Sequence, residues 1–245
     1  MTYAQFLLIF IVPLTVLGMV YFYRSSYPQK KTLKEAIYLL IFLAVTYTTP
    51  WDNYLVMTGV WNYEDHNILF RIGYVPFEEY CFFILQTIMT SCWVLWILKH
   101  TQIRKASAAG LSKHLGTLLL LGLLAASIMM LQSEKTRYLG LILVWVTPVF
   151  LLQWVSGGEH LLANLKTYAL CLFPPTFYLW IVDNYAIYRN IWAISETQTI
   201  GLKVSYLPFE EAVFFLATNI MLCQGLLLYL LLKDDFLLKL KKRHT

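Results

Sequence analysis

Seven long uncharged segments constrain this chain more than any other feature of its sequence. They are Thr2–Tyr23, Ala36–Trp51, Tyr80–Leu98, Leu115–Ser133, Tyr138–Gly158, Thr167–Val182 and Ala212–Leu232. With 59% hydrophobic and 13% charged residues, a chain of 245 residues cannot bury that much apolar surface in a soluble core. Backbone polar groups must be paired inside hydrocarbon, and the segments show no strand alternation. We therefore expect an all-α integral membrane protein with seven transmembrane helices.

The second and sixth segments are short for a membrane-spanning helix. Each helix crosses fully only if it continues through the aspartate that follows, Asp52 or Asp183. We therefore expect both carboxyls at or just inside a membrane interface. The first segment has no positively charged start and no cleavage pattern before Arg24, so we expect it to remain as a helix rather than to be removed as a signal peptide.

Basic residues are distributed unequally between alternate loops. One set of loops holds Arg24, Lys30, Lys31, Lys34, Lys99, Arg104, Lys105, Lys113, Lys166, Lys233, Lys239, Lys241, Lys242 and Arg243, and the other holds Arg71, Lys135, Arg137, Arg189 and Lys203. This bias predicts a cytoplasmic C-terminus and an outside N-terminus in the cytoplasmic (inner) membrane. The loops also explain the net charge of +5, so we expect the basic tail to contact anionic lipid and expect no nucleic-acid partner.

An internal repeat divides the chain into two similar halves. Asp52-Asn53-Tyr54 recurs as Asp183-Asn184-Tyr185, Trp61 as Trp192, and Tyr74 to Glu79 as Tyr206 to Glu211, with one residue gained in the second loop. We expect a first three-helix repeat over 1–105, a connector helix over 106–133 and a second three-helix repeat over 134–245. Three helices plus a connector return the chain to the same side. The repeats should then be parallel, with the repeated motifs converging at the outer end of the bundle.

The repeated acids have an ordinary interpretation and a functional one. Pro76 and Pro208 suit the first turn of a helix, where the glutamates that follow are favoured by the helix dipole. Against this, the two doublets and two aspartates bring six acids together, and mutual repulsion and desolvation disfavour ionising all of them. We predict that some are protonated and that they are catalytic. The candidates are Glu78, Glu210, Glu79, Glu211, Asp52 and Asp183.

Aromatic side chains accompany these acids. Each second glutamate lies three and four residues before a Phe pair and seven before Gln86 or Thr218, so these groups share a helix face. A protonated carboxyl could protonate an alkene there while ring faces stabilise the carbocation, and a second carboxylate could remove another proton. The predicted substrate contacts are Phe82, Phe83, Phe214, Phe215, Tyr54, Tyr185, Asn53, Asn184, Trp61 and Trp192.

Plainer interpretations exist for several of these residues. Tryptophan and tyrosine are enriched at membrane interfaces, and an interfacial belt is the more ordinary assignment for Trp51, Tyr54, Trp61, Tyr63, Trp180, Tyr185, Tyr188 and Trp192. The asparagines could simply cap helices or orient the acids. The five histidines have no metal-ligand spacing and no phosphate-binding glycine motif is present, so we expect no metal and no cofactor.

The doubled Pro-Phe-Glu-Glu helix starts, each following Asp-Asn-Tyr and Trp, resemble the heterodimeric-type lycopene cyclase family in its fused single-chain form. The same unit is similar to the cyclase part of fungal bifunctional carotenoid enzymes. The resemblance covers essentially the whole chain. It implies a redox-neutral conversion of lycopene ψ ends into β-ionone rings, giving γ- and then β-carotene, with membrane lipid and other carotenoid enzymes as neighbours. It carries over Glu78 and Glu210 as the Pro-x-Glu glutamates, with Glu79 and Glu211 beside them.

Three alternatives stay open at this point. The same cation could give ε rings, or the substrate could be a longer carotenoid. Parallel repeats with buried acids could also form a proton-coupled transporter, for which Pro174-Pro175 is the candidate helix break. A retinal-binding protein would need a lysine in the last helix, and Ala212–Leu232 has none.

Overall fold

The computed structural model describes residues 1–104, 106 and 110–232. Within these ranges, seven helical spans are long and apolar enough to cross a membrane, which confirms the predicted number. The helices are α1 (Tyr3–Phe6), continued through a π-helical turn (Leu7–Ile11) into α2 (Val12–Arg24), then α3 (Lys30–Met57), α4 (Phe77–His100), α5 (Gly110–Met130), α6 (Arg137–Ala163), α7 (Leu165–Tyr188) and α8 (Phe209–Leu232). Lys105, Lys233 and the basic tail from Lys239 to Arg243 lie outside the described residues.

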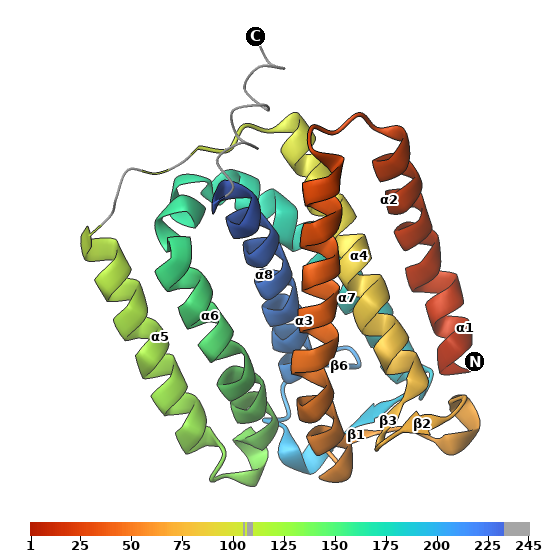
Figure 1. Cartoon of the computed structure of the whole chain (residues 1–245). Helices are drawn as coiled ribbons and strands as arrows, with labels where there is room; N and C mark the ends of the chain where they lie inside the picture. Colours follow the sequence, from red (N-terminus) through yellow and green to blue (C-terminus); the bar gives the residue numbers. More distant parts are fainter. Residues whose placement is uncertain (105, 107–109, 233–245) are drawn as a thin grey trace.

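Helices α4 and α8, which carry the glutamate doublets, are the most enclosed. In their most apolar stretches 67% and 56% of residues are buried, against 6% in α5. Leu118 and Leu119 of α5 are largely exposed, as expected for side chains that face lipid. Figure 1 shows α5 on the outside of the bundle, beside α6, and α8 among the other helices.

Short strands gather at one end of the bundle, here called the strand end. β2 (Arg71–Ile72) pairs with β3 (Val75–Pro76), and β5 (Lys203–Val204) pairs with β6 (Leu207–Pro208), each pair leading directly into α4 or α8. β1 (Trp61–Asn62) pairs antiparallel with β4 (Ala193–Ile194) and so joins the two long loops. In the described part of the chain, 3-10 turns also lie in the connections at Asp65–Asn67, Glu134–Thr136 and Glu196–Gln198. The N-terminus lies at the same end (Figure 1).

The two prolines lie one residue earlier than a first-turn position. Pro76 is the N-cap residue of α4 and Pro208 ends β6 just before α8. Each proline closes a hairpin whose turn needs a positive φ, which Gly73 adopts at +66° and Ser205 at +58°. A side chain at Gly73 would also place its Cβ 2.4 Å from the amide oxygen of Asn53. Glycine therefore permits both the turn and the close approach of α3.

The predicted extension of the two short helices is confirmed. α3 continues past Asp52 to Met57, and α7 continues past Asp183 to Tyr188. Both helices also continue through internal prolines, at Pro50 in α3 and at Pro174 and Pro175 in α7. Both aspartates are fully buried at the strand end. The ends of α3 and α7 and the starts of α4 and α8 thus bring the repeated acids together.

Candidate active site

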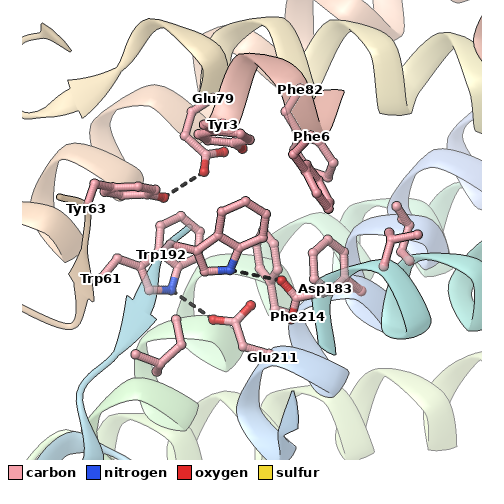
Figure 2. Close-up of a pocket in the computed structure, with 14 residues that line it drawn as sticks. Tyr3, Phe6, Trp61, Tyr63, Glu79, Phe82, Asp183, Trp192, Glu211 and Phe214 are labelled. Carbon is pink, nitrogen blue, oxygen red and sulfur yellow. Dashed lines mark hydrogen bonds between the residues drawn. The ribbon is translucent and has the colours of Figure 1, made fainter. Parts of the chain in front are cut away.

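A narrow chamber lies among the helix ends at the strand end (Figure 2). Side chains from α1, α4, α7, α8 and the two long loops enclose it. They are Tyr3, Phe6, Trp61, Tyr63, Glu79, Phe82, Leu179, Val182, Asp183, Trp192, Ile194, Glu211, Phe214 and Phe215. Three carboxyls and a ring of aromatic side chains therefore line one small space, and no lysine or arginine is among these described lining residues.

Glu79 is held by phenols. The hydroxyl of Tyr63 donates to Glu79 Oε1 at 2.6 Å, and the phenol of Tyr3 lies against the same carboxyl (Figure 2). Burial and the neighbouring charge of Glu79 raise the pKa of Tyr63 well above its ordinary value. Tyr63 is therefore a hydrogen-bond donor throughout the neutral pH range.

Glu211 is held by a phenol and an indole. Tyr138, in the first turn of α6, donates to Glu211 Oε1 at 2.5 Å, and Trp61 Nε1 donates to the same oxygen at 2.9 Å. Trp61 Nε1 also lies 2.8 Å from the Tyr138 hydroxyl. Because Trp61 belongs to the loop after α3, the first half of the chain directly contacts the glutamate of the second half.

The two aspartates differ in their surroundings. Asp183 Oδ1 accepts a hydrogen bond from Trp192 Nε1 at 3.0 Å, while its Oδ2 has no partner among the described residues. Asp52 lies outside the chamber lining, and neither of its oxygens has a partner in the described part of the chain. A buried polar atom without a partner is costly, and at Asp183 that atom belongs to a carboxyl that lines the chamber.

The first glutamate of each doublet supports a loop. Glu78 Oε1 accepts the backbone N–H of Leu69 at 2.8 Å, and Glu210 Oε1 accepts that of Ile200 at 2.7 Å. Both side chains are buried, and neither lines the chamber. Adjacent residues on a helix point about 100° apart, so each doublet directs one carboxyl toward the loop and the other toward the chamber.

Aromatic rings form the chamber walls. The Phe214 ring lies 5.4 Å from Trp61 at an interplanar angle of 83° and 5.6 Å from Trp51 at 13°. Trp51 in turn stacks on Trp145 at 4.3 Å. On the opposite side, the Trp192 ring lies edge-on to Phe6 at 5.1 Å. Ring faces in a dry site stabilise a cation by about 2 kcal/mol or more.

Comparison with known proteins decides the family. The chain is 35% identical over 220 residues to the lycopene beta-cyclase of Halobacterium salinarum, an alignment that covers 89% of this chain and 90% of that protein. The chain belongs to the lycopene cyclase family. It is also 34% identical over 240 residues to the bifunctional lycopene cyclase/phytoene synthase of Sporisorium reilianum, covering 91% of this chain and 34% of that protein. The corresponding enzyme of Phycomyces blakesleeanus is 32% identical over 231 residues, 91% of this chain and 38% of that protein.

This member of the lycopene cyclase family thus spans about a third of the fungal relatives and nearly all of the haloarchaeal one. No protein-family profile matches the chain. No solved structure matches it.

About half of the residues that the sequence predicted as catalytic or substrate-binding line the chamber. Of the predicted acids, Glu79, Glu211 and Asp183 line it, and of the predicted substrate contacts Phe82, Phe214, Phe215, Trp61 and Trp192 do so. Phe83 lies outside it, near Gln86, whose amide donates to Thr218 at 3.2 Å. The belt interpretation of Trp61 and Trp192 does not describe their position, because both are buried in the site.

The remaining predicted contacts lie elsewhere. Asn53 Oδ1 accepts the backbone N–H of Tyr74, and Asn184 Oδ1 accepts that of Tyr206, both at the hairpins. Tyr54 is exposed, and Tyr185 packs against Phe10 at 5.4 Å. The asparagines therefore hold the hairpin turns rather than touching the chamber acids.

Sequence reasoning missed several residues around the acids. Tyr3, Phe6 and Tyr138 were not singled out, and Tyr63 was assigned to the belt. The repeat itself held a usable indication, since Tyr3 opens the first helix and Tyr138 lies in the first turn of α6, the two helices that the repeat superposes. Their contacts with Glu79 and Glu211 depend on packing between helices far apart in the sequence.

Proposed function

We propose that this protein is a lycopene cyclase that closes rings at the ψ ends of lycopene by redox-neutral acid and base chemistry. The observation that supports this most is the chamber, where Glu79, Asp183 and Glu211 share a small space with aromatic rings. Membership of a family whose relatives are named lycopene cyclases supports the same activity. The enzyme is thus an intramolecular lyase or isomerase.

The reaction needs no net change in atoms or electrons. A protonated carboxyl transfers its proton to the terminal alkene of a ψ end, leaving a tertiary carbocation. A neighbouring double bond attacks that cation, which forms the new carbon–carbon bond of the ring and moves the positive charge to another ring carbon. A carboxylate then removes a proton from an adjacent carbon and restores the double bond.

The chamber carboxyls suit these roles in different ways. Glu79 and Glu211 are oriented by fixed O–H and N–H donors, which hold a carboxylate in place as a base or as a counter-charge to the cation. We assign the proton-donor role to Asp183, whose Oδ2 has no hydrogen-bond partner among the described residues. Trp61, Trp192 and Phe214 supply ring faces for the cation.

The proposed products are γ-carotene and then β-carotene, since loss of the proton from the newly joined ring carbon gives the β ring. Loss from the other neighbouring carbon would give an ε ring, and a longer carotenoid could present the same end group. The transporter alternative loses its candidate helix break. α7 runs unbroken through Pro174 and Pro175, whereas a transporter site is expected at interrupted helices.

We also propose that the two halves are parallel repeats, over residues 1–105 and 134–245, with 106–133 as the connector. Several matched contacts support this. Tyr47 donates to the carbonyl oxygen of Trp145, and Tyr178 donates to that of Phe10. Phe77 and Phe209 donate their backbone N–H groups to Phe70 and Leu202. The loop bonds of Glu78 and Glu210 match in the same way. Together these pairs support an extra residue at Gly201, whose φ is +79°.

The orientation proposed from the basic loops puts the strand end, and with it the chamber, at the outer face of the cytoplasmic membrane. The partners in this proposal are lycopene and membrane lipid, with other carotenoid enzymes as neighbours that supply the substrate.

Expression in a lycopene-accumulating bacterial host tests the activity. Cyclic carotenoids should form with the wild-type chain, and separation of the pigments distinguishes β from ε rings. A Glu79→Gln, Glu211→Gln double variant that reaches the membrane at the wild-type level serves as the control. Unchanged lycopene with verified wild-type protein in the membrane would remove the cyclase proposal.

A further inference from the structure

A second cavity, of about 300 Å³, lies between α3, α4, α6 and α8. Its lining is almost entirely apolar and belongs to membrane-spanning helices. It is called the helix groove here. The residues used below are Leu43, Ala44, Tyr47, Trp145, Leu152 and Phe214.

The mouth of the helix groove faces the surface that lipid covers. Leu43 and Tyr47 of α3 are 48% and 41% exposed, and Leu152 of α6 is 69% exposed. All three lie within helices that are long and apolar enough to span a membrane. A hydrocarbon molecule can therefore enter the groove sideways from the bilayer without crossing water.

The inner end of the helix groove adjoins the chamber. Phe214 lines both spaces, so they adjoin at this residue. Next to Phe214, the rings of Trp145 and Trp51 stack in parallel. The Tyr47 hydroxyl of α3 donates to the Trp145 carbonyl oxygen of α6 at 2.7 Å. A molecule lying in the groove can thus reach Phe214, which lines the chamber together with Glu211.

The polar side chains of the groove are only partly hydrogen-bonded, since Trp145 Nε1 and Gln153 Oε1 have no partner among the described residues. Gln86 donates to Thr218 at 3.2 Å, and Gln153 donates to the carbonyl oxygen of Met221 at 2.8 Å. A hydrocarbon ligand there gains from burial of apolar area, at about 25 cal/mol for each Å² removed from solvent. A long, rigid, apolar chain is the class of ligand that fits this lining.

We infer that the helix groove binds the polyene chain of the carotenoid, which enters from lipid between α3 and α6 and passes its ψ end beyond Phe214 into the chamber. This inference rests on the proposed function and adds the substrate path. In this inference only part of the polyene lies in the groove, and its far end stays in lipid. The two ends are then cyclised in separate binding events, with the monocyclic product released between them.

Filling the groove tests the inference. Ala44→Trp adds a large ring to the groove lining, and Ala126→Trp adds the same ring to the exposed face of α5. With membrane levels matched by immunoblot, Ala44→Trp should lower cyclic carotenoid formation at least about tenfold, which corresponds to 1.4 kcal/mol. Ala126→Trp should behave like the wild type.

A binding readout separates the groove from the chemistry. In the Glu79→Gln, Glu211→Gln background, the protein purified in mild detergent should retain lycopene, detected by its absorption, and Ala44→Trp should remove most of it. Equal lycopene retention or equal cyclisation by Ala44→Trp and Ala126→Trp would overturn the inference that the helix groove binds the polyene. A wild-type chain that forms no cyclic carotenoid would instead overturn the proposed function.

A bulky group that is attached after the helices have packed separates a blocked groove from a folding defect. Ala44→Cys and Ala126→Cys, labelled in membranes with a bulky lipid-soluble maleimide, carry the group only once the helices have packed. Loss of cyclisation on labelling of Ala44→Cys, beyond that of Ala126→Cys, supports the groove. Equal loss in both, with mass spectrometry verifying modification of the introduced thiols, rejects it.

Discussion

The glutamate doublets allow one sharp comparison, because neighbouring residues with the same side chain have different contacts. Glu211 faces the chamber and accepts hydrogen bonds from Tyr138 and Trp61. Glu210 accepts the backbone N–H of Ile200 in the loop. Glutamine has the same shape as glutamate and keeps an acceptor oxygen, but it cannot exchange a proton.

For Glu211→Gln we expect a loss of about 10²- to 10⁴-fold in turnover, the usual contribution of an acid or base group. This corresponds to about 2.7 to 5.4 kcal/mol in the activation barrier. Glu210→Gln should stay within about tenfold of the wild type, because the amide oxygen can still accept the Ile200 N–H. Glu210→Ala leaves that N–H unpaired and should destabilise the fold by about 1.5 to 3 kcal/mol.

The measurement is the initial rate of cyclic carotenoid formation in membranes, normalised to protein by immunoblot, with thermal unfolding in detergent for stability. The same comparison of Glu79 with Glu78 repeats the test in the other half of the chain, since Glu78 accepts the Leu69 N–H. If Glu210→Gln and Glu78→Gln lose as much activity as the chamber variants while remaining stable, the division of roles is refuted. The first glutamates, as carried over from the family, would then be catalytic.

Three further predictions concern the chamber and its support. Val182→Trp should fill the chamber and abolish cyclisation, whereas Val182→Ala should retain it, as measured by pigment analysis at matched membrane levels. Tyr63→Phe removes the 2.6 Å bond to Glu79 and should lower the rate about tenfold in the same pigment assay, and an unchanged rate would contradict the assignment. Asn184→Ala frees the backbone N–H groups of two hairpin residues and should lower the midpoint of thermal unfolding, while Asn184→Asp, which keeps the acceptor, should restore it.

The secondary structure followed closely from local sequence. Long uncharged runs require helices in lipid, and each motif proline precedes its helix because it cannot donate a ladder bond. The one-residue shift at Pro76 and Pro208 arose because each residue also closes a short hairpin. The number of spans and the extension of α3 and α7 past their aspartates were predicted on the same grounds.

The candidate site was predictable only in part. The repeat indicated that acids and aromatic residues from both halves meet, and Glu79, Glu211, Asp183, Trp61 and Trp192 do so. It gave no way to rank the members of a doublet, since both glutamates lie in the same first turn. It also gave no reason to separate Asp183, which lines the chamber, from Asp52, which does not.

What the sequence alone determined is the set of helices and the presence of matching acidic helix starts, because lipid imposes length and apolarity on each span independently of its neighbours. Tertiary structure decided which carboxyl faces the chamber and which tryptophan donates a hydrogen bond to that carboxyl. It also decided where a groove opens between α3 and α6. These depend on the rotation of each helix about its axis and on loops such as that of Trp61, which reaches the glutamate of the other half. Contacts between distant segments set that rotation, and no local pattern contains them.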